Sequence, residues 1–248
     1  MPWRTRTHPY FIVVSEIMLQ QTQVDRVRAK FVSFVERFPD WDSLAKASSH
    51  EVLSEWSGLG YNRRGLYLKR IAEVVAKEGE NVLKSKESLL ELPGIGPNTA
   101  GSILAFAFNQ PALFIETNIR SVFIHFFFND AKRKISDAEL FPLIEQTLDK
   151  ENPREWYYAL MDYGSHLKKL HPNPSRKSAH HVKQSSFKGS NRELRSNILK
   201  MIMKKSSSRA TIEKAFAASW DPIKIKKNLL DLEKEGFITK KRESYQIV

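Results

Sequence analysis

The chain has 248 residues, with 40 Lys and Arg against 28 Asp and Glu, which gives a formal net charge of +12 with His neutral. This length suits one large domain or two ordinary ones, and a hydrophobic fraction of 41% excludes a disordered chain. Because there is no cysteine, disulfides, thiolate zinc sites, iron–sulfur clusters and cysteine nucleophiles are excluded. No apolar run is long enough to span a bilayer and residues 1–10 lack the apolar core of a signal peptide, so we expect a soluble cytoplasmic protein.

Several stretches of the first 170 residues show helical periodicity. In the first two of these stretches, apolar residues recur every three to four positions, as in a helix that buries one face, and the other three look like further helices. These stretches are residues 24–35, 66–75, 99–108, 137–148 and 153–163. Small residues in the third, such as Gly101, would let a neighbouring backbone approach closely. Because strand signals are almost absent, we expect this part of the chain to be all-α.

The C-terminal part has a different pattern. Pro, Gly, Ser and Lys predict a linker at residues 171–191. Three helices and two short strands are expected after it, which together describe a winged helix. They are residues 192–203, 210–218 and 222–235 for the helices and 237–239 and 245–248 for the strands. Lys224, Lys226 and Lys227 lie on the third helix, where a DNA-facing helix would carry them, although many winged helices bind proteins instead.

Positive charge is concentrated in this C-terminal part. Residues 170–248 hold 18 Lys and Arg against 7 Asp and Glu, a balance of +11, whereas residues 1–169 hold 22 against 21. A basic domain beside a nearly neutral one favours a polyanionic partner, and nucleic acid fits best because each neutralised phosphate releases counterions. A merely basic surface, or one that meets anionic membranes, remains an alternative on charge alone.

The segment Leu92-Pro93-Gly94-Ile95-Gly96 is an informative local motif. Two glycines one residue apart permit a tight turn between helices with exposed backbone N–H groups. At the start of the next helix such donors suit a DNA phosphate, so we assign Gly94, Ile95, Gly96 and Thr99 to DNA binding. An ordinary turn between two helices is the alternative interpretation.

Several segments together resemble the MutY-type adenine DNA glycosylases of the helix-hairpin-helix (endonuclease III-like) superfamily. In the family's order, over about residues 1–168, they are Pro2-Trp3, Pro9-Tyr10, Ser15 to Val24, Gly58-Leu59-Gly60-Tyr61, Leu92 to Gly96 and Leu160 to Gly164. The resemblance implies an all-α, two-lobed glycosylase domain over residues 1–187, followed by a small winged-helix (α+β) domain over 188–248. The six-helix lobe would cover about residues 21–119, and the second lobe would combine 1–20 with 120–187.

The resemblance also implies an enzyme that flips a base out of duplex DNA and hydrolyses its N-glycosidic bond. One carboxyl would protonate the departing base, and a second would stabilise the cation-like sugar. Glu16 matches the family's acid, and its apolar neighbours would raise its pKa. Glu116-Thr117-Asn118 stands where the family usually has Asp-Gly-Asn, so the second carboxyl is one methylene longer, and Asn118 matches the family's asparagine.

Other matched positions concern DNA contact and specificity. Gln20, Gln21 and Tyr61 match residues that fill or wedge the base stack around the vacated space. Asn98 stands in the base pocket, where adenine glycosylases often carry Tyr or Ser and bifunctional relatives carry a Schiff-base Lys. Without an amine there we predict a monofunctional glycosylase with no strong lyase activity.

The predicted substrate is double-stranded DNA with a mispaired or damaged base, with adenine opposite 8-oxoguanine or guanine as the first choice. A uracil or thymine mismatch glycosylase is one alternative, and a catalytically silent protein that binds DNA structures is another. We expect a nucleoid-associated monomer that does not bind membranes. The family's usual C-terminal domain, which reads 8-oxoguanine, is not recognisable, and the winged helix stands in its place.

No cofactor is expected. The family's iron–sulfur cluster has no Cys ligands here, and four histidines lie in its place without the spacing of a common zinc signature. They are His166, His171, His180 and His181. We therefore predict no bound metal, and the one ion left open is a monovalent cation at the hairpin.

Overall fold

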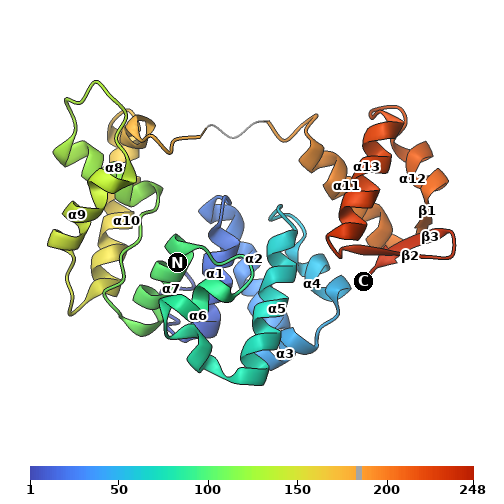
Figure 1. Cartoon of the computed structure of the whole chain (residues 1–248), viewed down its shortest axis with the longest axis horizontal. Coiled ribbons are helices and arrows are strands. Elements are labelled where there is room, and N and C mark those ends of the chain that lie inside the picture. The colour runs from blue at the N-terminus through green and yellow to red at the C-terminus, as the bar shows by residue number, and fades with distance from the viewer. Residues whose placement is uncertain (183–185) are drawn as a thin grey trace. The chain divides into compact units, whose positions relative to one another are not determined.

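The computed structural model describes residues 1–182 and 186–248, and most of these residues are helical (Figure 1). The chain divides into two units, each of which combines two separate stretches. The first unit consists of Met1–Gln21 and Val74–Lys183, and the second of Thr22–Glu73 and Gln184–Val248. One helix, α5 (Arg63–Glu78), runs through the point of division.

The first unit is built around two helices that are buried on most sides. Its elements are α1 (Pro9–Leu19), the 3₁₀ helix η1 (Glu80–Leu83), α6 (Lys86–Glu91), α7 (Pro97–Phe108), α8 (Thr117–Phe127), α9 (Asp137–Thr147), α10 (Pro153–Leu170) and the 3₁₀ helix η2 (Pro174–Lys177). α1 and α7 pack against each other, and each buries seven residues. Because helices that are apolar on most sides lie in a core, these two form the centre of the unit, while α8 packs along α10.

Two glycines bring backbone segments unusually close in this unit. A Cβ placed on Gly101 of α7 would lie 2.8 Å from the Cβ of Phe114. A Cβ on Gly164 of α10 would lie 2.3 Å from the carbonyl oxygen of Asn118. Any larger residue at either position would push away the segment that contains Glu116. The prediction that small residues of α7 admit a neighbouring backbone is therefore confirmed at Gly101.

The second unit joins helices from the first half of the chain to the C-terminal residues. Its elements are α2 (Val24–Arg37), α3 (Trp41–Lys46), α4 (Ser49–Trp56), most of α5, α11 (Asn191–Lys204), β1 (Ser207–Ser208), α12 (Arg209–Phe216), α13 (Pro222–Lys234), β2 (Ile238–Lys241) and β3 (Ser244–Ile247). The strands form an antiparallel sheet in the order β1-β3-β2, with Ile238 opposite Ile247. The predicted three helices and terminal hairpin are confirmed, and β1 adds a strand that the sequence pattern does not indicate.

The C-terminal part shares a hydrophobic core with α4 and α5. Leu53 and Leu66 belong to the same buried cluster as Leu194 and Ile198 of α11. The ring of His50 also contacts this part, with Nε2 3.0 Å from the carbonyl oxygen of Met203. The C-terminal helices and strands are thus packed onto residues 22–73 within the second unit.

The stretch predicted as a linker, residues 171–191, is partly packed. η2 lies against α8, and Ser178 is buried and forms a parallel bridge with Ile135. The N–H of Ala179 donates to the carbonyl oxygen of Ile135 at 2.8 Å. Residues 183–185 of this stretch lie outside the described residues. Its first part is therefore an ordered extension of the first unit.

Among the helices that the structure describes, none has the length and apolar character that crossing a bilayer requires.

Candidate active site

Glu16 lies in the second half of α1, where its neighbours Ser15 and Ile17 are fully buried. The residue itself is partly exposed, but protein surrounds its carboxyl closely. Burial raises the pKa of Glu16 from 4.5 to about 7, and the negative charge of Glu116 adds to this, whereas a hydrogen bond from Ser102 lowers it. A carboxyl with this pKa holds a proton near neutral pH and can donate it.

Ser102 of α7 is the polar partner of this carboxyl. Its Oγ lies 2.6 Å from Oε2 of Glu16 and 3.0 Å from the carbonyl oxygen of Thr99. A serine hydroxyl has one hydrogen and can also accept, so Ser102 serves both protonation states. It donates to Glu16 when that carboxyl is ionised, and it accepts from Glu16 and donates to Thr99 when the carboxyl is protonated.

Glu116 caps the N-terminus of α8. Its Oε1 accepts from the N–H of Asn118 at 2.7 Å and from the N–H of Ile119 at 2.9 Å. Burial raises the pKa of Glu116, while those two N–H groups and the charges of Lys168 and Arg120 lower it. Because a helix N-terminus also favours negative charge, this position suits an ionised carboxylate.

The two carboxyls therefore lie within electrostatic range of each other, in one site of the first unit. When two such groups interact, they titrate as a pair. The ionised form of Glu116 is stabilised by several donors and cations, whereas that of Glu16 has the hydroxyl of Ser102. We infer that the first proton to bind this pair is held by Glu16.

Asn118 links Glu116 to Lys168, a residue that the sequence does not single out. The Nζ of Lys168 donates to Oδ1 of Asn118 at 2.7 Å, and Nδ2 of Asn118 donates to Oε2 of Glu116 at 3.2 Å. Burial lowers the pKa of Lys168, and Glu116 raises it. One signal for Lys168 exists in the sequence: it lies one helical turn after Gly164, the residue that α10 places against Asn118.

Gln20, directly after α1, joins the end of that helix to the hairpin between α6 and α7. Its Nε2 donates to the carbonyl oxygen of Gly94 at 3.0 Å and lies 3.2 Å from Oγ1 of Thr99. Gly94 has a φ of 80°, which favours glycine, and Gly96 caps α7. The N–H of Ile95 donates within the turn to Leu92, at 3.3 Å.

Asn98 is exposed in the first turn of α7, and its side chain is used structurally. Its Oδ1 accepts from the N–H of Ile115 at 3.1 Å. This bond fixes the backbone immediately before Glu116. The role of Asn98 in base specificity stays a prediction.

The predicted residues are divided between the two units. Glu16, Gln20, Gln21, Gly94, Ile95, Gly96, Asn98, Thr99, Glu116 and Asn118 belong to the first unit, and Tyr61, Lys224, Lys226 and Lys227 to the second. The three lysines are exposed on α13. The structure thus brings the two carboxyls, Asn118 and the hairpin into one unit, and it assigns the other predicted DNA contacts to the other unit.

Tyr158 of α10 is, like Ser102 and Lys168, a residue that the sequence does not single out. Its ring stacks on Phe106 with centroids 4.5 Å apart, and the guanidinium of Arg4 lies 4.4 Å from its centroid. Burial and the charge of Glu16 raise the pKa of Tyr158. Its hydroxyl is buried and has no hydrogen-bond partner among residues 1–182 and 186–248. Phe106 lies one turn from Ser102 on α7, which is why the hydroxyl comes within range of Glu16.

The predicted absence of a metal stays a prediction. Within the described part of the chain, no three His, Cys, Asp or Glu side chains gather as metal ligands would. The ring of His171 lies 5.0 Å from that of His125, and His180 Nε2 lies 3.9 Å from a carboxylate oxygen of Asp137.

Glu16 and Glu116, with their hydrogen-bond partners, thus form an acid and an anion in one site. Glu16 can donate a proton, and the carboxylate of Glu116 can stabilise a positive charge that develops nearby. Cleavage of a glycosidic bond needs this division of roles between two carboxyls.

A family model described as HhH-GPD superfamily base excision DNA repair protein matches residues 14–145. The chain belongs to this superfamily. The matched residues include both carboxyls, the hairpin and Asn118. The superfamily identified from the sequence is therefore confirmed.

Relatives within the superfamily agree with this assignment. The chain is 34% identical over 166 residues to the adenine DNA glycosylase of Buchnera aphidicola subsp. Baizongia pistaciae, covering 66% of this chain and 47% of that protein. It is 33% identical over 177 residues to the adenine DNA glycosylase of Homo sapiens, covering 66% of this chain and 32% of that protein. The chain thus spans less than half the length of these two relatives.

Solved structures of the superfamily share the fold. A thermostable thymine-DNA glycosylase matches with a TM-score of 0.59 and 25% identity, over 66% of this chain and 77% of that one. A non-covalent endonuclease III–DNA complex matches with a TM-score of 0.55 and 17% identity, over 73% of this chain and 78% of that one. The predicted all-α helix-hairpin-helix glycosylase fold is confirmed.

Proposed function

We propose that the chain is a DNA glycosylase that hydrolyses the N-glycosidic bond of adenine mispaired with 8-oxoguanine or guanine in duplex DNA. The observation that carries the proposal is the pair of carboxyls, in which Glu16 has a pKa raised to about 7 and Glu116 caps the N-terminus of α8, a position that favours its ionised form. Adenine is preferred because the two curated relatives compared above are adenine DNA glycosylases.

The proposed reaction begins with a target nucleotide flipped out of the duplex. Glu16 donates its proton to a ring nitrogen of the base as the bond to C1′ breaks, and the bonding electron pair leaves with the base. The carboxylate of Glu116 stabilises the resulting cation-like sugar. Water then adds to C1′ and gives a proton to the ionised Glu16, which leaves an abasic site and the free base.

We further propose that the enzyme is monofunctional. Asn98 has no amine with which to attack C1′, and its amide oxygen already accepts from Ile115. Strand cleavage should therefore require added alkali or heat. Strand cleavage that needs neither, and is lost in Glu16→Gln, would contradict this part of the proposal.

A second candidate substrate is thymine or uracil mispaired with guanine. The observation in its favour is the similarity to the thymine-DNA glycosylase, at 25% identity. The same two carboxyls would serve that reaction, so specificity must be measured directly.

The test is a panel of duplexes with A:8-oxoG, A:G, T:G, U:G and hypoxanthine pairs, followed by alkali cleavage. Excision should be fastest for adenine, and Glu16→Gln and Glu116→Gln should each lower the single-turnover rate by about 100-fold or more while DNA affinity changes little. The control is Glu91→Gln, which neutralises an exposed glutamate just before the hairpin. If both carboxyl variants cut as fast as wild type, the assignment of the site is wrong.

A further inference from the structure

The loop of residues 58–61 has unusual backbone angles that need support from surrounding contacts. Gly58, Gly60 and Tyr61 all have positive φ, at 100°, 74° and 46°. Glycine adopts such angles readily, but an aromatic residue there is strained. Strained non-glycine residues of this kind gather at functional sites, where surrounding contacts over-determine them. Tyr61 is also 39% exposed, so its ring is available to a partner.

The inner side of this loop is held by α4 and α5. The buried Arg64 donates from Nη2 to the carbonyl oxygen of Gly60 at 3.0 Å and to Oγ1 of Thr22 at 2.9 Å. The indole N–H of Trp56 donates to the same carbonyl oxygen of Gly60 at 3.1 Å. These bonds fix the backbone of Gly60, the residue before Tyr61.

The side chain of Tyr61 is held by the C-terminal domain. Arg192, the second residue of α11, donates from Nη1 to the hydroxyl oxygen of Tyr61 at 3.0 Å. Its guanidinium carbon lies 5.6 Å from the centroid of the tyrosine ring, as does that of Arg64. An exposed aromatic ring beside the guanidinium of Arg192 is suited to nucleic acid, because the ring can contact a base while this cation faces a phosphate.

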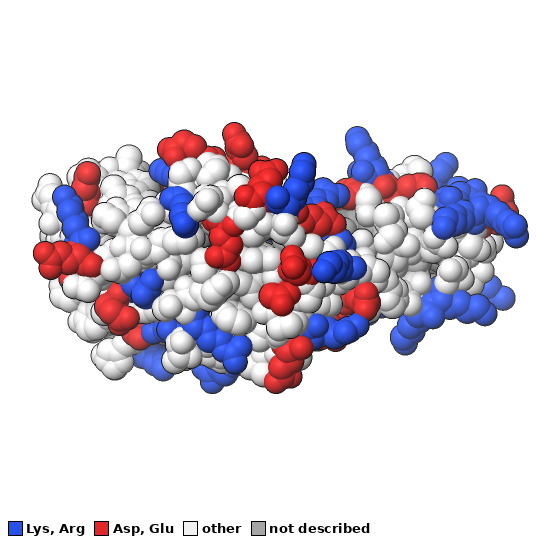
Figure 2. All heavy atoms as spheres, turned by 90° about the horizontal axis from the view of Figure 1, so that it is seen from below, with Lys and Arg blue, Asp and Glu red and all other residues white. Residues whose placement is uncertain are grey.

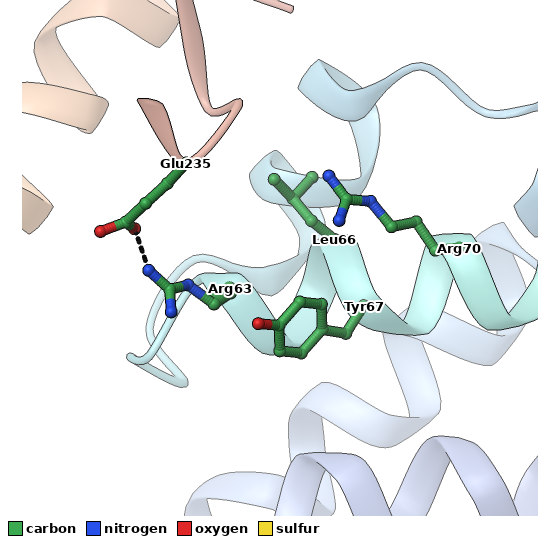
Figure 3. Close-up of a pocket in the computed structure, with 5 residues that line it drawn as sticks. All are labelled: Arg63, Leu66, Tyr67, Arg70 and Glu235. Atoms are coloured by element: carbon green, nitrogen blue, oxygen red, sulfur yellow. Dashed lines mark ion pairs between the residues drawn. The ribbon is translucent and has the colours of Figure 1, made fainter. Parts of the chain in front are cut away.

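Further contacts keep α11 in place on α5. Glu235, at the end of α13, accepts from Arg63 of α5 at 2.7 Å and from Arg195 of α11 at 2.5 Å. Figure 3 shows Arg63 pointing to Glu235 across a shallow pocket that Leu66, Tyr67 and Arg70 also line. These ion pairs place the start of α11 beside α5, where Arg192 contacts Tyr61.

We propose that the C-terminal domain presents Tyr61 to duplex DNA, with Arg192 as the positioning residue that holds its ring. The inference rests on the proposed function, because it assumes that the duplex is the partner. The charge of the domain fits this role, since Lys and Arg side chains gather over it (Figure 2). The winged helix thus acts on the DNA-contacting loop of the preceding helices, beyond adding positive charge.

The test uses the full chain and a duplex that carries 2-aminopurine next to a tetrahydrofuran abasic-site analogue. A tyrosine that enters the base stack changes the fluorescence of 2-aminopurine, and this probe contains no cleavable bond at the abasic position. Variants are Arg192→Ala, Arg192→Lys, Tyr61→Phe and the Arg192→Ala/Tyr61→Phe double variant. The control is Arg209→Ala, which removes one positive charge from the same domain at an exposed residue that pairs with Glu213.

Loss of the Arg192–Tyr61 hydrogen bond should shift the stacking equilibrium about fivefold, in Arg192→Ala and in Tyr61→Phe alike. The double variant should be no worse than Arg192→Ala, and Arg192→Lys should recover part of the signal. Arg209→Ala should keep the full fluorescence change at saturating protein. The proposal is overturned if Arg192→Ala behaves like Arg209→Ala, or if Tyr61→Phe behaves like wild type. Because the probe reports stacking without excision, a chain that stacks but cuts no base would refute the proposed function alone.

Discussion

The second half of α1 and the N-terminus of α8 each bury a glutamate carboxyl, but they surround it with different polar partners. Glu16 projects from a helix between buried neighbours and meets one serine hydroxyl, so burial dominates and its pKa rises to about 7. Glu116 caps a helix, receives two backbone N–H bonds and has Lys168 and Arg120 nearby. The local backbone and its donors therefore decide which carboxyl is the acid and which is the anion.

The largest expected effect concerns stability at Glu16. The raised pKa means that the folded state binds a proton more tightly than the unfolded chain does, so this contribution is complete below about pH 4.5 and is lost as pH rises through about 7. Glutamine does not titrate. The free energy of unfolding of Glu16→Gln relative to wild type should therefore increase by about 3 kcal/mol between pH 4 and pH 8.

Urea unfolding across this pH range measures the effect, with Glu91→Gln as the exposed control. A difference between Glu16→Gln and wild type that is the same at pH 4 and pH 8 would contradict the raised pKa, and with it the contrast between the two helices.

The next largest effect concerns the support of Glu116. Lys168→Met keeps the apolar stem and removes the amine that holds Asn118, so the single-turnover excision rate should fall about tenfold. The pKa of Glu116 should rise, because a charge that lowers it is lost, and the rising limb of the pH–rate profile should move to higher pH. Lys169→Met changes the exposed neighbouring lysine and should leave both quantities as they are in wild type. Equal effects of the two variants would remove Lys168 from the site.

A smaller effect should distinguish the adjacent residues Tyr157 and Tyr158, whose hydroxyls differ in their hydrogen bonding. The hydroxyl of Tyr157 donates to the carbonyl oxygen of Ala112 at 2.9 Å, so Tyr157→Phe should destabilise the fold by about 1 kcal/mol and leave excision intact. Tyr158→Phe removes a buried hydroxyl without a partner in the described chain, so stability should stay equal or rise while excision slows. Thermal unfolding and single-turnover rates measure both variants. If Tyr158→Phe loses stability and keeps its rate, Tyr158 has a structural role only.

The smallest expected effect concerns the hydrogen bond from Ser102 to Glu16. Ser102→Ala removes the hydrogen bond that lowers the pKa of Glu16, so that pKa should rise. The high-pH limb of the rate profile should then move to higher pH, with a change of less than about fivefold at the optimum. A limb that stays in place would show that Ser102 does not act on the acid.

Local patterns in the sequence predict much of this fold. Periodic apolar residues locate α2, α5, α7 and α10, and the glycines of Gly94-Ile95-Gly96 locate the turn between α6 and α7. α8, whose buried residues include Ile119, Val122 and Phe123, is not among the helices predicted from the sequence. The packing of Leu53 and Leu66 against α11 joins residues far apart in the chain and has no local signature.

The sequence likewise identifies some residues of the candidate site and misses others. Glu16, Glu116 and Asn118 lie in segments that match a family, so the sequence identifies them. Ser102, Tyr158 and Lys168 join the site only because α7 and α10 fold against α1 and α8. An isolated serine or tyrosine on a helix has no feature in the sequence that separates it from a surface residue, and Lys168 has only its position one helical turn after Gly164.

The most direct measurement is a ¹³C NMR titration of the glutamate carboxyls, with the Glu16 and Glu116 signals assigned from Glu16→Gln and Glu116→Gln. Glu16 should titrate near pH 7 in wild type and at lower pH in Glu116→Gln, because the neighbouring negative charge is gone. A Glu16 signal that titrates near 4.5 in both proteins would contradict the claim that the two carboxyls share one site with the proton on Glu16.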